Sequence, residues 1–242
     1  MLSVKVLGSG SSGNCYLVSN DSTNILLECG IKKKELTFGL VSHGLDISSI
    51  DGCLISHEHK DHCLEIQYVD EYTNIYTNNS VYNIYKDNTY NLSFKHPLKP
   101  FKIGSVAIMP INVEHGETEC YGYIIRDSET CILFVTDFKQ FSANLKQFKF
   151  DMVMIETNYV EEIINAALDT EHGYKYLRQI NTHCSVENAV IHLKAMDLSN
   201  CKEIMCVHLS SDVGDKKTIR AIMESEFPNI DISIACKKGG VE

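Results

Sequence analysis

Two targeting signals are missing from this chain of 242 residues. No apolar run approaches the ~18 residues that a membrane span requires. The N-terminus enters a strand-like pattern at residues 4–7 and lacks the basic start and long apolar stretch of a secretory signal peptide. We therefore expect a cytoplasmic protein that does not associate with a membrane.

Paired cysteine motifs are also missing. The chain has ten cysteines, but no two of them form a CxxC pair, the spacing typical of zinc cages and redox motifs. The scatter also argues against a disulfide framework. In a reducing compartment such cysteines are expected to be small buried residues.

Arginine is scarce. The three arginines are Arg126, Arg178 and Arg220, and the formal net charge is −10. Affinity for nucleic acid depends largely on neutralisation of phosphates by lysine and arginine. The composition therefore favours a small anionic substrate or a short strand over a long duplex, although bound metal ions can offset the charge locally.

The order of apolar segments predicts an α/β fold. No repeat, low-complexity stretch or linker interrupts it, so residues 1–242 are predicted to form one domain of two packed sheets with helices outside. The predicted strands are residues 2–8, 15–18, 25–27, 51–56, 75–77, 105–113, 121–126, 131–136, 152–155, 203–207 and 232–235. The predicted helices are residues 32–45, 63–72, 81–86, 160–168, 185–195 and 216–226.

A Gly-Ser turn, GSGSSG at residues 8–13, joins the first two strands. It lacks the GK[ST] ending of a phosphate-binding P-loop and does not open a helix. The simpler interpretation is a flexible hairpin turn. The alternative is a loop near the floor of an active site.

The strongest motif is HEHKDH at residues 57–62, which begins where an apolar strand ends. Neutral imidazole and carboxylate groups suit zinc and similar divalent ions. On an extended segment His57 and His59 point the same way and can bind one ion together. The following helix directs Asp61 and His62 elsewhere, so the spacing predicts two ions side by side.

This HxHxDH pattern resembles the metallo-β-lactamase superfamily, and later segments match that family in order. Leu27-Glu28-Cys29-Gly30 matches its carboxylate strand, with Glu28 in place of the usual aspartate, which suggests a hydrogen bond to the ligand loop. His115, Asp137 and His208 each follow a predicted strand, as the remaining family ligands do. The resemblance implies an αββα sandwich of two packed mixed sheets flanked by helices.

Within the superfamily the chain is similar to the WalJ/YycJ-like branch, which includes DNA exonucleases. Residues 8–15, residues 208–210 and the Glu156-Thr157-Asn158 segment carry this similarity. The chain departs from the branch at Tyr159-Val160, where the branch has His-Asp. It departs again at residues 182–185, where Thr-His-Cys-Ser replaces Gly-His-Leu-Ser.

The resemblance implies a site with two divalent metal ions, for which zinc is the expected metal and manganese the alternative. One ion would be held by His57, His59 and His115, the second by Asp61, His62 and His208, and Asp137 would bridge them. A hydroxide shared by the ions would attack the substrate, and Asp61 would orient it or accept its proton.

Further site residues follow from the same resemblance and from position. His183 precedes Ser185 at a predicted helix N-terminus, where backbone N–H groups favour phosphate. We expect His183 to touch the scissile phosphate and act as a general acid, and Asn158 and Ser185 to contact substrate. The alternative for His183 is a polar residue near a helix cap. His172 is placed in a loop that could cover the site.

Three classes of function follow. The expected one is cleavage of phosphodiester bonds, as a DNA nuclease or exonuclease or as a phosphodiesterase of small or cyclic nucleotides. The second is a hydrolase of esters, lactones or thioesters, because one fold supports several chemistries. The third, a binder without metals, conflicts with the complete ligand set. The substrate strand and the formation of a homodimer are left open.

Overall fold

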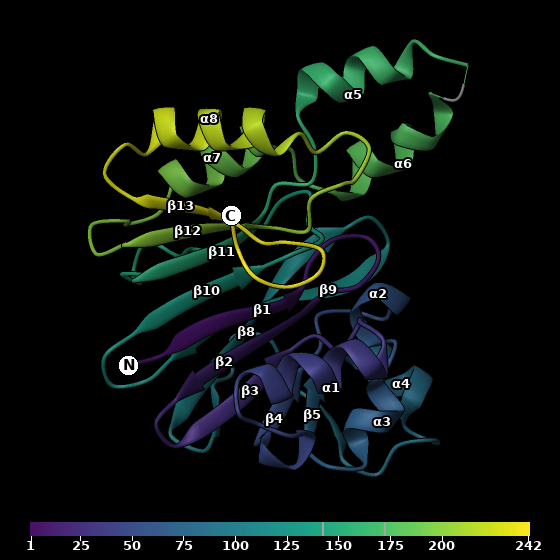
Figure 1. Cartoon of the computed structure of the whole chain (residues 1–242), viewed down its shortest axis with the longest axis vertical. Coiled ribbons are helices and arrows are strands. Elements are labelled where there is room, and N and C mark those ends of the chain that lie inside the picture. The colour runs from purple at the N-terminus through teal and green to yellow at the C-terminus, as the bar shows by residue number, and fades with distance from the viewer. Residues whose placement is uncertain (142, 172) are drawn as a thin grey trace.

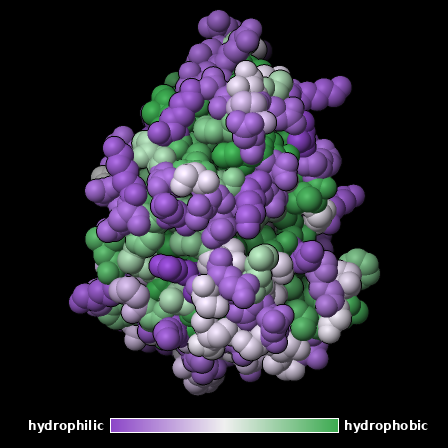
Figure 2. All heavy atoms as spheres, turned by 90° about the vertical axis from the view of Figure 1, so that its left-hand side faces the viewer, coloured by the Kyte–Doolittle hydropathy of each residue, from purple (hydrophilic) through white to green (hydrophobic). Residues whose placement is uncertain are grey.

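A computed structural model describes residues 1–141, 143–171 and 173–242. His172, which the sequence places in a loop over the site, lies outside these described residues. Most of the surface in Figure 2 is hydrophilic, with hydrophobic residues in scattered patches between the polar ones. No helix among the described residues has the length and apolar composition that crossing a membrane demands.

The first sheet has six strands in the order β1-β2-β3-β4-β5-β6 (Figure 1). Strands β1 to β3 pair antiparallel, and β3 to β6 pair parallel. The strands are β1 (Ser3–Gly8), β2 (Cys15–Asn20), β3 (Thr23–Leu27), β4 (Gly52–Leu54), β5 (Ile75–Thr77) and β6 (Leu92–Phe94).

The second sheet has seven strands in the order β13-β12-β11-β10-β9-β8-β7. Strands β7 to β10 pair antiparallel, and β10 to β13 pair parallel. The strands are β7 (Phe101–Ile103), β8 (Val106–His115), β9 (Thr118–Arg126), β10 (Cys131–Val135), β11 (Met152–Glu156), β12 (Glu203–Val207) and β13 (Asp231–Ile234).

Helices lie outside both sheets (Figure 1). Beside the first sheet are α1 (Lys33–Ser42), α2 (Lys60–Cys63), α3 (Ile66–Asp70) and α4 (Asn79–Tyr85), with a short 3-10 helix η1 (Ile47–Ser49). With the second sheet are α7 (Val186–Lys194) and α8 (Lys216–Glu226), while α5 (Glu161–Leu168) and α6 (Tyr174–Thr182) project together beyond it.

Alternating side chains divide the core into layers. In β10, Ile132 and Phe134 enter the core between the sheets, whereas Leu133 and Val135 face α7 and α8. In β3, Leu26 faces the helices of the first sheet while its neighbours face the second sheet. Strands buried on both faces read as continuous apolar runs. The predicted αββα sandwich of two mixed sheets flanked by helices is confirmed.

Several local predictions were wrong. No strand was predicted at β6 or β7, which are short strands at the edges of the two sheets and of which only Ile103 is fully buried. Helix α6 was also missed, because it is polar on average and none of its residues is fully buried, although Tyr176 and Ile180 pack against Ile164 of α5 and its neighbours. The helix predicted at 63–72 corresponds to α3 alone, because α2 ends at Cys63 and the Glu65 N–H between the two helices donates to the Cys29 carbonyl instead.

Nine of the ten cysteines are buried, Cys236 is half-buried, and all ten are free thiols. This agrees with the interpretation of these residues as small core side chains. The Gly-Ser turn joins β1 to β2, as expected.

Candidate metal centre

The motif residues lie where strands of both sheets end. Glu28 follows β3, His115 ends β8, Asp137 follows β10 and His208 follows β12. His57 follows β4, and His59 is the extended residue that precedes α2, with φ −63° and ψ 142°. Asp61 and His62 then lie in α2 itself. The change from extended chain to helix therefore sends the two halves of the motif in different directions.

The first group of donors is His57, His59 and His115, whose ligating atoms all lie within 4.8 Å of one another. His59 Nδ1 is 2.8 Å from His57 Nε2 and 3.2 Å from His115 Nε2. The opposite ring nitrogens are engaged, His57 Nδ1 with the Ser56 hydroxyl at 2.9 Å and His115 Nδ1 with the Thr182 carbonyl at 2.8 Å. Such bonds fix a ring and leave its other nitrogen to a metal.

The second group is Asp61, His62 and His208. Asp61 Oδ2 is 3.5 Å from His62 Nε2 and 3.7 Å from His208 Nε2. Asp137 lies between the groups. Its Oδ2 is 3.0 Å from His62 Nε2 and contacts His208 Nδ1, and it also falls within one cluster with His57.

The charge states suit metal ions. Burial lowers the pKa of His57, His59 and His115, so these imidazoles are neutral at neutral pH, the form that binds a metal. Burial opposes a charge on His62, but Asp137 and Glu28 raise its pKa. The same negative field would stabilise a cation. Five imidazoles and two carboxylates in overlapping groups therefore fit divalent ions.

Glu28 holds in place the ligand loop, the segment that carries the HEHKDH motif. Both of its carboxylate oxygens accept from the Ser56 N–H at 3.2 Å, one residue before His57. Its Oε1 is also 3.6 Å from His62 Nδ1, a buried nitrogen that has no hydrogen-bond partner among the described residues. The predicted hydrogen bond from Glu28 to the ligand loop is therefore present.

Backbone strain gathers at the same place. Glu28, Asp137 and His208 have φ of 64°, 49° and 53°, in the left-handed region that non-glycine residues rarely adopt. Such conformations persist where the surrounding structure enforces them, and they cluster at functional sites. Here they turn each side chain inward directly after a strand.

Gly30 permits the close approach of two chain segments. A Cβ added to Gly30 would lie 1.7 Å from the Asp61 carbonyl oxygen and 2.6 Å from the His62 nitrogen. Hydrogen bonds join the segments, from the Asn14 N–H to the Asp61 carbonyl and from the Cys29 N–H to the His62 carbonyl, both 2.8 Å. The glycine after the carboxylate strand thus sets the position of two ligands.

His183 forms a further group of potential donors with Asp137, Glu156 and His208. Its Nδ1 is 2.7 Å from Glu156 Oε1 and 3.6 Å from Asp137 Oδ1, and its side chain is 20% exposed. Burial alone would lower the pKa of His183, but the Glu156 carboxylate raises it to about 9. The imidazole is therefore a cation at neutral pH.

Sequence reasoning gave Glu156 no role of its own. Its carboxylate, fully buried at the end of β11, accepts from the N–H groups of Phe138 and Cys184 at 3.0 and 3.1 Å as well as from His183. The available signal was a carboxylate that ends an otherwise apolar strand. Glu156 orients His183 and ties it to the loop that carries Asp137.

Asn158 and Ser185 take different places. Asn158 borders the metal centre, donates to the His208 carbonyl at 2.8 Å and accepts from Gln179. The Ser185 hydroxyl is buried, accepts from the Asn188 N–H at 3.0 Å as the N-cap of α7, and donates to Glu161 at 2.9 Å. Ser185 thus serves the start of a helix and does not border the cleft described next.

A cleft of about 520 Å³ opens onto the donor groups. Helix α6 supplies Lys175, Arg178, Gln179 and Thr182 to one side of it, and α2 supplies Lys60. Lys175 is paired with Asp212 at 3.3 Å. The lining also contains Asp61, Asp137 and Asp212, so Lys60 and Arg178 would suit an anionic substrate once bound metal ions offset the carboxylates.

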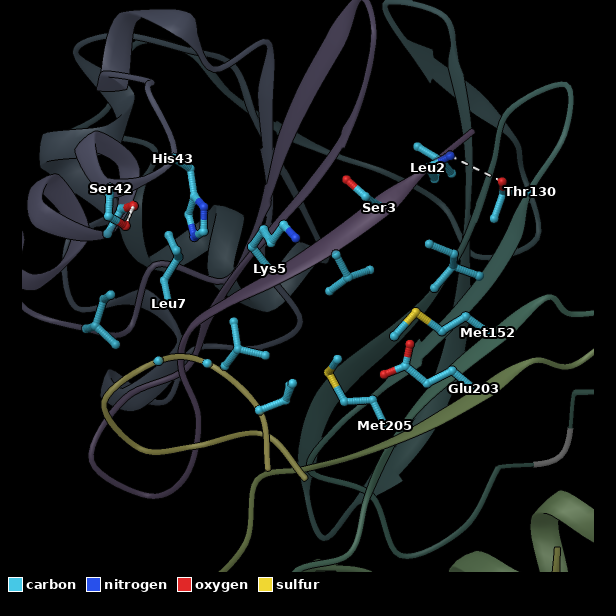
Figure 3. Close-up of a pocket in the computed structure, with 18 of the residues that line it drawn as sticks. Leu2, Ser3, Lys5, Leu7, Ser42, His43, Thr130, Met152, Glu203 and Met205 are labelled. Atoms are coloured by element: carbon cyan, nitrogen blue, oxygen red, sulfur yellow. Dashed lines mark hydrogen bonds between the residues drawn. The ribbon is translucent and has the colours of Figure 1, made fainter. Parts of the chain in front are cut away.

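A larger cleft lies elsewhere (Figure 3). It measures about 880 Å³ and is lined mainly by β1, the strands β10 to β12 and helix α1, with Leu2, Met152 and Met205 among its apolar residues. It contains none of the candidate ligands. Size alone therefore does not locate the chemistry of this protein, and the smaller, polar cleft is the candidate active site.

The chain is similar to known proteins. Residues 23–208 match the model of the beta-lactamase superfamily domain. The exodeoxyribonuclease YycJ of Bacillus anthracis is 24% identical, over 90% of this chain and 86% of that protein. The exodeoxyribonuclease WalJ of Streptococcus pneumoniae is 22% identical, over 95% of this chain and 89% of that protein.

Two solved structures share the fold. The metallo-beta-lactamase fold protein YhfI of Bacillus subtilis superposes with a TM-score of 0.75 at 20% identity, over all of this chain and 99% of its own. A diphosphatase from the PhnP family superposes with a TM-score of 0.67 at 18% identity, over all of this chain and 97% of its own.

Proposed function

The chain belongs to the beta-lactamase superfamily and is a metal-dependent hydrolase, and we propose that it uses two divalent ions to cleave phosphodiester bonds of a DNA strand. The observation that carries the proposal is the set of seven donors in overlapping groups around one buried carboxylate, at the floor of a cleft edged by cations. The seven are His57, His59, Asp61, His62, His115, Asp137 and His208.

The metal ions and the residues of the chain would have separate roles in catalysis. Bound ions would supply a water of lowered pKa and positive charge for the phosphoryl oxygens. Zinc suits the histidine-rich donor set, and manganese is the alternative. Asp61, whose side chain is 25% exposed, faces the cleft and can accept a proton from the attacking water.

His183 would donate a proton, whereas Asp61 would accept one. As a cation held by Glu156 it faces the cleft beside Asp137. There it neutralises charge that develops on the phosphate and donates a proton to the leaving oxygen. Removal of a general acid of this kind costs ~10²–10⁴-fold in rate.

The substrate is proposed from the cleft and the relatives together. Lys60 and Arg178 border the cleft, where a phosphate backbone would lie. The curated relatives, matched over most of their length, are named exodeoxyribonucleases, which favours DNA over a small or cyclic nucleotide. We place the enzyme in the cytoplasm, because ten free cysteines suit a reducing compartment.

A substrate panel tests the proposal. Protein loaded with zinc or manganese is offered single- and double-stranded DNA, RNA, cyclic nucleotides, bis-p-nitrophenyl phosphate and a lactone. We expect DNA to be shortened and the chromogenic diester to be a weak substrate. His57→Ala should abolish turnover, while the matched control His43→Ala, an exposed histidine outside the cluster, should retain it. Efficient turnover of the lactone, with no phosphodiester cleaved under either metal, would contradict the proposal.

A further inference from the structure

A second, smaller pocket of about 230 Å³ adjoins the metal cleft. It lies between the Gly-Ser turn at residues 8–13 and the loop at residues 209–214 that follows His208. Ser11, Ser210 and Ser211 border both the pocket and the metal cleft. A substrate lying over the metal centre therefore has the Gly-Ser pocket directly beside it.

The turn that forms the pocket is fixed in place and is not a loose hairpin. The Ser9 hydroxyl accepts from the His208 N–H at 3.0 Å and bonds the Tyr16 hydroxyl at 2.8 Å. The Gly10 N–H donates to Asn14 Oδ1 at 2.9 Å, and Asn14 in turn contacts His62 Nε2 at 3.2 Å. The position of the turn is thus coupled directly to two of the candidate ligands.

The opposite wall is equally close-packed. A Cβ added to Gly214 would lie 2.6 Å from the Ser210 carbonyl oxygen and 2.8 Å from that of Asn158. The loop after His208 therefore folds tightly against the strand end that carries Asn158. Both walls of the Gly-Ser pocket are preformed.

The pocket offers hydrogen-bond donors that nothing else uses. Within the described residues, the backbone N–H groups of Ser11, Ser12, Leu209 and Ser211 have no acceptor. The exposed hydroxyls of Ser11 and Ser12 also have no partner there. Free backbone N–H groups on both walls of a concave pocket are suited to binding an anion.

The charged residues of the Gly-Ser pocket also favour an anion. Lys216 and Lys237 line the pocket, and none of the residues that line it is acidic. Lys216 forms an ion pair with Glu242 at 2.8 Å. Lys237 has no carboxylate within salt-bridge distance in the part of the chain that is described. A site rich in donors and lacking carboxylates favours an anion over a metal ion or a cation.

We propose that the Gly-Ser pocket binds a second phosphoryl group of the substrate, beside the phosphate that is cleaved at the metal centre. This inference rests on the proposed function. It adds to it the side on which the substrate continues beyond the metal centre, which is the side where Ser11, Ser210 and Ser211 border both pockets. The bound group is either a terminal phosphate monoester or the neighbouring diester of the same strand. Both carry the anionic oxygens that lysines, hydroxyls and free N–H groups recognise.

The test compares oligonucleotides that differ in one phosphate. Metal-loaded protein is given tetrathymidylates that carry a 5′-phosphate, a 5′-hydroxyl, or a neutral methylphosphonate next to the scissile linkage. In the wild type, loss of the recognised phosphate should lower kcat/KM by ~10-fold or more, as expected for charge-assisted hydrogen bonds. The arm that responds identifies the monoester or the diester as the bound group.

Variants assign the effect to the pocket. In Lys216→Ala/Lys237→Ala the ratio of kcat/KM between the responsive pair of substrates should fall towards one. The matched control is Lys217→Ala/Lys238→Ala, in which the neighbouring lysines, which do not line the Gly-Ser pocket, are removed with the same change in charge. The control should keep the wild-type ratio. No response in any wild-type arm, or an equal ratio in both double variants, overturns the inference.

Failure of the proposed function would be visible separately, because bis-p-nitrophenyl phosphate has no second phosphate. If this diester and all oligonucleotides resist cleavage, the metal-loaded protein is titrated with inorganic phosphate in a calorimeter. Loss of one bound phosphate in Lys216→Ala/Lys237→Ala, but not in the control, still supports the pocket. Identical binding by both variants overturns it.

Discussion

Substitution of Gly30 by alanine should dismantle the metal centre although Gly30 carries no side chain. The added Cβ would lie 1.7 Å from the Asp61 carbonyl oxygen, half the 3.4 Å at which ordinary contact begins. The Asp61–His62 peptide must therefore move by more than 1 Å, whereas ligands must be placed to within ~0.5 Å.

The energetic cost can be worked from the contacts that the movement breaks. Three hydrogen bonds reach this peptide, from the Asn14 N–H and the Asn14 side-chain amide to the Asp61 carbonyl at 2.8 and 3.2 Å and from the Cys29 N–H to the His62 carbonyl at 2.8 Å. At about 1 kcal/mol each, their loss lowers the free energy of unfolding by about 3 kcal/mol. In a chain of this size that lowers Tm by about 6–12 °C.

The assay measures Tm by circular dichroism, metal content by elemental analysis, and turnover of bis-p-nitrophenyl phosphate. The folded Gly30→Ala protein should hold fewer ions than the wild type, and its activity should fall by ~10²-fold or more. The control is Gly44→Ala, whose Cβ meets nothing within 4 Å and whose φ of 75° adds only backbone strain, about 1 kcal/mol. Full metal content and wild-type turnover in Gly30→Ala would refute the reasoning.

Three other substitutions separate the roles of neighbouring residues. Burial lowers the pKa of His183, but Glu156 raises it to about 9, so activity that depends on the His183 cation should decline as the pH rises through 9. In Glu156→Gln this alkaline limb of the pH–rate profile should move to lower pH, and an unshifted limb would rule out the pairing. Glu28→Gln should weaken metal affinity by about 10-fold or more, as measured by chelator competition, because the Ser56 N–H loses a charged acceptor; unaltered affinity would show that Glu28 does not support the ligand loop. Ser185→Ala should lower the free energy of unfolding in urea by about 1 kcal/mol through loss of the N-cap of α7, whereas a raised KM at unchanged stability would show that Ser185 binds substrate.

The sequence predicted most where residues close in the chain share one local geometry. His57, His59, Asp61 and His62 lie within six residues, so strand and helix periodicity alone separate them into two groups. His115 and His208 are far apart in the chain, and only the resemblance joined them to the motif. The structure shows why that works, because the ends of strands from both sheets meet at one edge of the sandwich.

What the sequence did not predict depends on contacts between distant segments. Helix α6 is polar on average and has no fully buried residue to mark it, yet it brings Lys175 and Arg178 to the cleft. The role of Glu156 arises because β11 ends beside the loops that carry Asp137 and His183. Likewise, the Gly-Ser turn looks flexible as a sequence and becomes a fixed wall only through its bonds to Asn14 and His208.

The most direct test of the account is the number of metal ions that each chain binds. Protein purified without chelators and supplemented with zinc or manganese is analysed for its elements, and anomalous scattering from its crystals locates the ions. The account predicts two ions per chain, one within bonding distance of His57, His59 and His115, the other of Asp61, His62 and His208, with Asp137 touching both. A single ion, or none, in fully supplemented and folded protein would contradict it.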